Sequence, residues 1–409
     1  MNEKKKAIYL DHAATTPVDA RVLKAMQPYF SEKFANPGSL HNLGLEAKVA
    51  IKEARETVAE IINANVEEII FTPGGTASIN LAIKGIAEQK GKGHIITTKI
   101  EHPAVLDTCK YLEQKGFSVT YLDVDNDGMI KVKDVQKAIR KDTILITIMY
   151  ANNEIGTILP ITEIGKIAQK HKILFHTDAC QAAGALDLNV EKLNVDLITL
   201  NGSKIYGPKG IGILYLKKRI KLTPLIHGGG QEQGLLNGTE NVPAIIGFAK
   251  ALELAQAEKD KENKRLIGLR DYFIKKVLTE IKDSFLNGHP TKRLPNNVNI
   301  SFLNVEGESV LLHLNEKGVY VSTGSACSSH KLEISHVLDA IGLVHDAAHG
   351  SIRFSLGKPT SKTDLDYVIK QLIEIIAILR RISPVKITMK EIRNKVSKTF
   401  SQCSEETQK

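Results

Sequence analysis

Short apolar segments alternate with amphipathic segments over the first half of the chain, and this alternation restricts the fold more than any other feature. Five segments have the length and character of buried strands, namely residues 68–72, 95–98, 119–124, 143–149 and 195–200. Helical patterns occupy residues 45–62 and 132–140 and also follow Ala77 and Pro103. Apolar strands separated by helices predict an α/β fold with a mostly parallel sheet covered on both faces.

Polar residues follow these strands at the points where a parallel sheet binds its ligands, beyond the carboxyl ends of the strands. Thr76 and His102 follow the first two of these strands, Asn153 follows Met149, Asp178 follows Phe175 in a further segment, and Lys204 follows Leu200. Each residue also has an ordinary explanation: His102 could cap a helix or lie in the core, and Asn153 could form a turn. Five such residues at strand ends of one sheet favour a shared ligand site.

Asp178 and Lys204 indicate a particular chemistry. They are separated by one helix-and-strand step, so they can meet in the same crevice. Pyridoxal phosphate needs this pair, because the lysine holds its aldehyde as a Schiff base and the carboxylate keeps its pyridine nitrogen protonated. On these two residues alone, a turn cap and a solvated lysine remain the simpler explanation.

A glycine turn, Pro73-Gly74-Gly75-Thr76, leads from the first strand into a helix. Such a turn presents free backbone N–H groups and the positive end of the helix dipole, which together can hold a phosphate. Thr76 adds a hydroxyl donor. A tight turn capped by threonine explains the same residues without a ligand.

Composition is that of an ordinary globular protein, with 409 residues, 42% hydrophobic and 25% charged. The net charge of +9 is scattered along the chain, which favours a solvated surface over nucleic-acid binding. No secretory signal and no apolar run of membrane-spanning length can be read. Four cysteines are too widely spaced for a disulfide framework or zinc knuckle, so we expect a cytoplasmic protein without a membrane partner. They are Cys109, Cys180, Cys327 and Cys403.

The second half predicts a smaller α+β lobe. Its expected helices are 251–281, one from Glu306, 335–341 and 363–382, and its expected strands are 297–302, 319–322 and one around Arg353. We therefore expect a large domain of residues 15–259, a small domain of residues 1–14 and 260–384, and a polar basic tail of residues 385–409.

The motifs together resemble the NifS-like cysteine desulfurases, a class-V aminotransferase branch of the fold type I pyridoxal-phosphate enzymes that supplies sulfur for iron–sulfur cluster assembly. The resemblance extends to about Pro384 and rests on YLDHAATTPVD from Tyr9, NPGSLH, FTPGGT, IEHPAVL, ANNEIG, HTDACQ, KIYGPKGIG, HGGGQE, GTENVP, STGSACSS and SIRFSLG. It implies conversion of L-cysteine to L-alanine by a homodimer.

The resemblance also implies roles for individual residues. Lys204 would bind the cofactor aldehyde, Asp178 would pair with the pyridine nitrogen, and Gln181 would bind the ring hydroxyl. His102 would stack on the ring and help to move protons. The phosphate would be held by Gly75, Thr76, Asn201 and Ser203, with Thr239 from the partner subunit. The substrate carboxylate would be held by Asn153 and Arg353.

Arg353 and Cys327 also have a case of their own. Arg353 lies in an alternating segment, where a guanidinium can clamp a carboxylate, although an exposed arginine on an edge strand would give the same pattern. Cys327 lies in a stretch of small residues typical of a mobile loop, so its thiolate could attack the substrate sulfur and become a persulfide. A small core residue is the general alternative for a cysteine, and we expect it for Cys109 and Cys180.

No resident metal is implied, although Cys327 could share an iron–sulfur cluster with a scaffold partner. The sulfur acceptor would be an iron–sulfur scaffold protein or a protein of tRNA or cofactor thiolation. A related β-lyase such as selenocysteine lyase, and a degenerate paralogue that acts as a scaffold or binding subunit, are the alternative functions.

The chain departs from the family pattern in three places. Asn201-Gly202-Ser203 replaces the usual Ser-Gly-His, so an imidazole that could carry positive charge is absent and we expect a lower affinity for the cofactor. Gln233, Leu236 and Asn237 replace the usual arginines and serine of a rim loop, and Ala77 and Ile79 replace the usual Glu and Asp.

Overall fold

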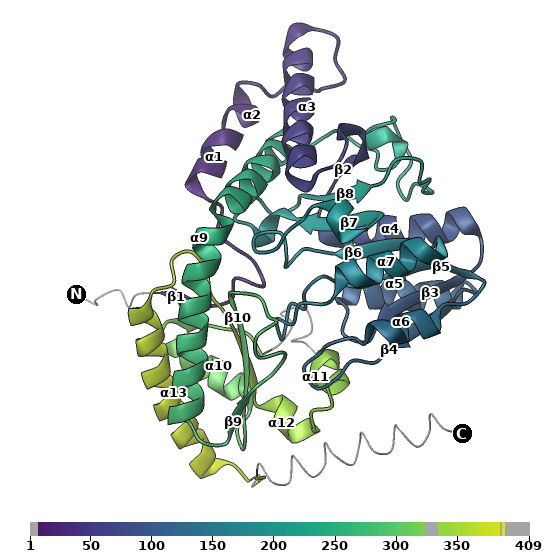
Figure 1. Ribbon diagram of the computed structural model, residues 1–409. Helices are drawn as coiled ribbons and strands as arrows, with labels where there is room; N and C mark the ends of the chain where they lie inside the picture. The colour runs from purple at the N-terminus through teal and green to yellow at the C-terminus, as the bar shows by residue number, and fades with distance from the viewer. Residues whose placement is uncertain (1–6, 324–333, 385–386, 389–409) are drawn as a thin grey trace.

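The computed structural model describes residues 7–323, 334–384 and 387–388, and its main feature is a large twisted sheet (Figure 1). Within the described residues this sheet has seven strands in the order β2-β8-β7-β6-β5-β3-β4. They are β2 (Ile69–Thr72), β3 (His94–Thr98), β4 (Ser118–Leu122), β5 (Thr143–Thr147), β6 (Leu174–Asp178), β7 (Leu197–Asn201) and β8 (Gly212–Leu216). Only β8 runs antiparallel to its neighbours, so the predicted mostly parallel sheet is confirmed.

Helices cover both faces of the sheet because alternate strand residues point to opposite sides. Ile69 and Phe71 join a core with α3 (Asn42–Ile62), α7 (Ile161–His171) and the first part of α9 (Val242–Glu280). The intervening Ile70 joins a second core, with α4 (Gly75–Lys90) and α5 (Pro103–Gln114). The two-sided burial explains why these strands are apolar throughout.

A second group of elements lies beside the sheet (Figure 1). Strand β10 (Asn297–Phe302) pairs antiparallel with β9 (Ser284–Leu286) and β12 (Ser351–Ser355), and β1 (Ile8–Tyr9) pairs in parallel with β11 (Val319–Tyr320). Helices α10 (Gly307–Glu316), α13 (Lys362–Ile382) and the end of α9 enclose a core that includes Phe273, Phe302 and Phe354. The N-terminal strand thus joins late elements of the chain.

The helix expected over residues 251–281 begins earlier, at Val242. Asn241 caps it by accepting the Ala244 N–H at 3.2 Å, and Pro243 occupies the first turn, where a missing N–H costs nothing. Because α9 continues without a break across residue 259, the division into two domains has no helix boundary to mark it and stays a prediction.

The remaining elements are short. They are the helices α1 (Ala20–Met26), α2 (Pro28–Ser31), α6 (Val132–Ala138), α8 (Val190–Leu193), α11 (His336–Ala340) and α12 (His345–His349), and the 3-10 turns η1 (Val66–Glu68), η2 (Gly202–Lys204) and η3 (Glu232–Gly234). In the part of the chain that is described, no helix combines the length and apolar character needed to cross a bilayer.

Candidate active site

The carboxyl ends of the parallel strands bring the predicted polar residues to one edge of the sheet. Asp178 is the last residue of β6, and Lys204 ends the 3-10 turn that follows β7. His102 follows β3 and caps α5 by accepting the Ala104 N–H on Nδ1 at 3.1 Å. His102 therefore caps a helix, as the alternative explanation expected, and it also lies at the site.

The surroundings of His102 favour the neutral form of its imidazole. Burial lowers its pKa, while the nearby Asp178 raises that pKa and Lys204 lowers it. Because Nδ1 accepts a backbone hydrogen bond, the single proton of the neutral ring lies on Nε2. His102 therefore offers an N–H group beside the acid and the lysine.

Lys204 is held by a segment near the N-terminus. Its Nζ donates to the carbonyl of Ala13 at 3.0 Å and to that of Ala14. The Gln181 side chain donates to the same Ala13 carbonyl at 3.0 Å. Thr16 binds the chain on both sides of the lysine: its hydroxyl donates to Ser203 O at 3.0 Å and accepts the Tyr206 N–H at 2.8 Å.

A cavity of about 500 Å³ opens where α4 begins. Its lining includes four predicted phosphate-binding residues: Gly75, Thr76, Asn201 and Ser203. A Cβ on Gly75 would lie 2.9 Å from Cys180 Sγ and 3.5 Å from Asn201 Nδ2, so a larger residue here would crowd the wall of this cup. Asn201 Oδ1 accepts the Ser203 N–H at 3.3 Å, which leaves its amide N–H₂ toward Gly75.

This cup fits a phosphate. The first turn of α4 has N–H groups without helical partners, and the dipole of a helix of 16 residues favours an anion there. Asp178 is 7% exposed, and its Oδ1 accepts the Cys180 N–H at 2.9 Å, which holds in place a carboxylate that can pair with the ring nitrogen. The donors present, together with Lys204, therefore suit pyridoxal phosphate.

Arg353 is buried, and the alternative of an exposed arginine on an edge strand is wrong. Its side chain is 2% exposed, and Nη2 forms an ion pair with Asp11 at 2.7 Å. Nη1 donates to the Asn153 carbonyl at 3.1 Å, whereas Nε is buried without a partner. An unpaired N–H on a buried guanidinium costs free energy until a ligand accepts from it.

The loop of Asn153 is fixed from behind by β10. Asn297 donates to the carbonyls of Asn153 and Glu154 at 3.4 and 3.3 Å, and Asn299 donates to Glu154 at 3.2 Å. Buried Arg293 donates to Ile155 O at 3.0 Å. These bonds place Asn153, itself 9% exposed, beside Arg353.

The described cysteines are poor nucleophiles. Cys109 is fully buried in the core, as predicted, and burial raises its pKa to about 12. Cys180, which was expected in the core, is free and only partly buried, although burial still raises the pKa of its thiol. Cys327 and Cys403 lie outside the described residues.

Thr239 is exposed and does not line the cup of its own chain. The departures from the family pattern have local partners: Gln233 donates to Glu67 O at 2.7 Å, and Asn237 donates to Ile226 O at 2.7 Å. Ile79 is 1% exposed and packs in the core, which explains the apolar residue there.

Several residues that connect Arg353 and Lys204 to the N-terminal segment were not predicted from the sequence. Asp11 pairs with Arg353, and Thr16 brackets Lys204. His12 is buried, with Nδ1 3.0 Å from Ser355 O, and fits only because Gly357 has no side chain, since a Cβ would lie 2.2 Å from its Nε2. The conspicuous YLDHAATTPVD motif was the available signal, but no residue type in it points to these contacts.

Known proteins are similar to this chain in sequence and in fold. A family model for class-V aminotransferases matches residues 8–368. Cysteine desulfurase IscS of Dictyoglomus turgidum (strain DSM 6724 / Z-1310) is 57% identical over 385 residues, which cover 93% of this chain and 98% of that protein. A solved NifS-like protein has a TM-score of 0.86 at 40% identity and covers 91% of this chain and 100% of its own.

A second solved structure, SspA in complex with cysteine, has a TM-score of 0.76 at 41% identity and covers 85% of this chain and 98% of its own. The chain belongs to the class-V aminotransferase family and, within it, to the NifS-like cysteine desulfurases. The predicted family, fold class and dependence on pyridoxal phosphate are thereby confirmed.

Proposed function

We propose that this protein converts L-cysteine to L-alanine and transfers the sulfur to Cys327 as a persulfide. The observation that carries the proposal is the buried Arg353, whose guanidinium has an unpartnered N–H and is tied to the same N-terminal segment as Lys204. A carboxylate binder beside a cofactor lysine is what an amino-acid substrate needs. The likeness to SspA, solved with cysteine, supports that substrate.

Bound pyridoxal phosphate supplies an electron sink that weakens bonds around the α-carbon of an amino acid. We assign Lys204 to the aldehyde, Asp178 to the pyridine nitrogen and Gln181 to the ring hydroxyl. The phosphate is assigned to Gly75, Thr76, Asn201 and Ser203. Arg353 and Asn153 orient the cysteine carboxylate, and His102 donates or recovers a proton at Nε2.

Cys327 completes the reaction. Its thiolate attacks the sulfur of the substrate, a new S–S bond forms, the C–S bond breaks, and a proton added to the remaining carbon gives alanine. A scaffold protein of iron–sulfur cluster assembly then takes the outer sulfur, and Cys327 could share the growing cluster with that scaffold. The raised pKa values of Cys109 and Cys180 favour Cys327 for this role.

We propose a homodimer in the cytoplasm as the working form. Thr239 is exposed and lies away from the cup of its own chain, which agrees with a donor that reaches the cup of the partner subunit. Both described cysteines are free, as in a reducing compartment.

The test is to record the visible spectrum of the purified protein and to assay sulfide and alanine after adding L-cysteine and a thiol reductant. We expect a yellow protein whose sulfide release is abolished in Cys327→Ala and Lys204→Ala, while Cys327→Ala keeps its colour. Cys109→Ala is the matched control and should release sulfide normally. A colourless protein, or a yellow one inert toward cysteine, would favour the degenerate paralogue or another β-lyase.

A further inference from the structure

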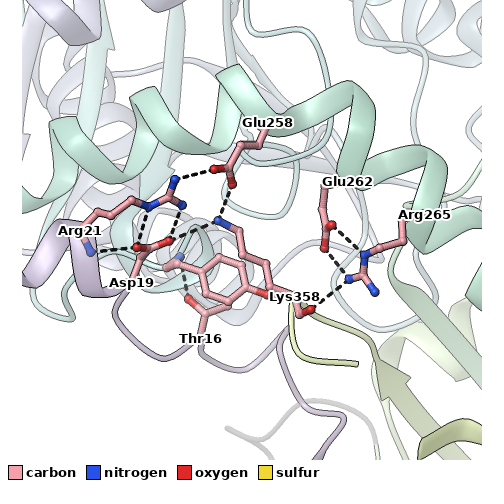
Figure 2. Close-up of polar contacts among 8 residues, drawn as sticks. Thr16, Asp19, Arg21, Glu258, Glu262, Arg265 and Lys358 are labelled. Atoms are coloured by element: carbon pink, nitrogen blue, oxygen red, sulfur yellow. Dashed lines mark hydrogen bonds and ion pairs between the residues drawn. The ribbon is translucent and has the colours of Figure 1, made fainter. Parts of the chain in front are cut away.

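A cluster of charged residues outside the cavity joins three parts of the chain (Figure 2). Arg21, in the first turn of α1, donates to Asp19 at 2.7 Å and to Glu258 of α9 at 2.6 Å. Lys358, in the loop after β12, places its Nζ 2.8 Å from Glu258 and 3.4 Å from Asp19. The Lys358 ammonium therefore sits between two carboxylates that a second cation holds in place.

Lys358 also contacts the segment of the cofactor lysine. Its Nζ lies 4.9 Å from the centroid of the Tyr206 ring, and its backbone N–H donates to the Tyr206 hydroxyl at 2.7 Å. Tyr206 comes two residues after Lys204 and has a φ of +62°, a left-handed conformation that is uncommon outside glycine. Contacts from Lys358 and Thr16 hold it in that conformation.

Helix α9 supports the same loop from one face. Arg265 donates to Thr360 O at 2.7 Å and to Gly357 O at 2.9 Å, and Glu262 holds its guanidinium at 2.7 Å. Figure 2 shows Glu258, Glu262 and Arg265 projecting from this helix toward Lys358. Their spacing of four and three residues puts them on one side of a helix.

We propose that Lys358 is a positioning residue that holds the loop following Arg353 against the loop that carries Lys204. The inference rests on the proposed function, which assigns the substrate carboxylate to Arg353 and the cofactor to Lys204. Lys358 follows Arg353 by five residues, and Tyr206 follows Lys204 by two. The contact between Lys358 and Tyr206, which we call the tether, therefore lies only a few residues along the chain from Arg353 and from Lys204. A displacement of about 1 Å between bound reactants can cost a hundredfold in rate.

The contacts of Lys358 differ from those of an isolated surface ion pair, which contributes little to the stability of the folded protein. The ammonium has two carboxylates and a ring face, and its side chain is only 29% exposed. Hydrogen bonds from Arg21 and Lys358 lower the pKa of Glu258 to about 2, so this acceptor stays ionised at neutral pH. The Glu258 carboxylate that Lys358 contacts is therefore charged at neutral pH.

The experiment compares holoenzyme of the wild type, Lys358→Ala and Lys358→Arg. Lys362→Ala is the matched control, because Lys362, the first residue of α13, also lies 4.8 Å from a tyrosine ring, but that ring belongs to Tyr272 of α9 and not to the segment of Lys204. Two quantities are measured: kcat/KM for cysteine, and backbone hydrogen exchange in the resting enzyme over residues 203–207 and 351–357. The exchange measurement needs no turnover, so it still reports on the tether if cysteine proves not to be the substrate.

For Lys358→Ala we expect kcat/KM to fall about tenfold and exchange to accelerate in both segments together. Lys358→Arg should restore both quantities, and Lys362→Ala should change neither. Faster exchange confined to residues 357–360, or a kcat/KM within twofold of wild type, would overturn the proposal. If Lys358→Ala does not fold, Glu258→Gln decides the question, since it should accelerate exchange in both segments by a smaller factor, and no acceleration at 203–207 would overturn the proposal.

Discussion

The cup at the start of α4 is assigned to the cofactor phosphate and the pocket around Arg353 to the substrate carboxylate, yet the two sites would bind their anions with different chemical groups. The cup uses backbone N–H groups and the neutral side chains of Asn201 and Ser203, and its Thr76 is exposed. The pocket uses one guanidinium that is 2% exposed and already paired with Asp11. Binding in the cup therefore depends on shape, whereas binding in the pocket depends on the competition between two carboxylates for one cation.

The largest effect is expected from Arg353→Ala, which removes the only cation that we assign to the substrate carboxylate. Loss of one partner of a buried, hydrogen-bonded charge pair should lower kcat/KM for cysteine on the order of 10³-fold. Steady-state kinetics measures this loss in kcat/KM. Arg380→Ala is the control, because Arg380 lies near the far end of α13 and donates to Leu303 O. A loss below fivefold would assign the substrate carboxylate elsewhere.

Gly75→Ala tests whether shape governs the cup. The added Cβ would lie 2.9 Å from Cys180 Sγ, so we expect affinity for pyridoxal phosphate to fall roughly tenfold, as for overpacking of a filled site. Equilibrium dialysis of the cofactor measures the loss. The double variant with Cys180→Ala should recover part of it, whereas no recovery would show that the sulfur is not the obstacle.

Ser203→His tests whether a positive charge in the cup raises the affinity for pyridoxal phosphate. A charge-assisted hydrogen bond to phosphate is about twice as strong as a neutral one, so cofactor affinity should rise about fivefold. The gain should shrink above the pKa of the new imidazole, and Ser203→Ala should show no gain at any pH. Unchanged affinity at pH 6 would mean that this position does not reach the phosphate.

Asp11→Asn should give the smallest effect, and with opposite signs in two measurements. Without the competing carboxylate, KM for cysteine should fall about threefold, while the free energy of unfolding should fall by about 1 kcal/mol because a charged hydrogen bond becomes a neutral one. Kinetics and urea unfolding give the two values. A raised KM would indicate that Asp11 orients Arg353 more than it competes for it.

Strand and helix patterns predict the sheet well because burial on both faces leaves a plain apolar signal. Strands β3, β5 and β10 lie within one or two residues of their expected ends. Strand β8 was not predicted, because its residues Gly212–Leu216 begin at the end of the glycine-rich KGIG segment. The start of α9 was also wrong, because the signals of Asn241 and Pro243 precede the charged part of the helix.

The candidate site was predictable wherever one residue carries its own chemistry, as Lys204, Asp178 and the Gly75 turn do. The burial of Arg353 was not, because it depends on β10, Asp11 and the Asn153 loop, which are distant in sequence. The hydrogen bonds from Lys204 to the carbonyls of Ala13 and Ala14 were not predictable either, because every residue type has a backbone carbonyl. Such contacts follow from the path of the backbone, which local patterns do not record.

The path of the N-terminal segment also has a consequence for biosynthesis. Ile8 pairs with Val319 and Asp11 bridges Ser355, so this segment is made more than 300 residues before its partners and reaches them only after those partners have left the ribosome. The large sheet can form earlier from its own strands, but the surroundings of Lys204 stay incomplete until then. Closing such a long loop is slow and entropically unfavourable, so we expect cofactor capture to coincide with one of the last steps of folding.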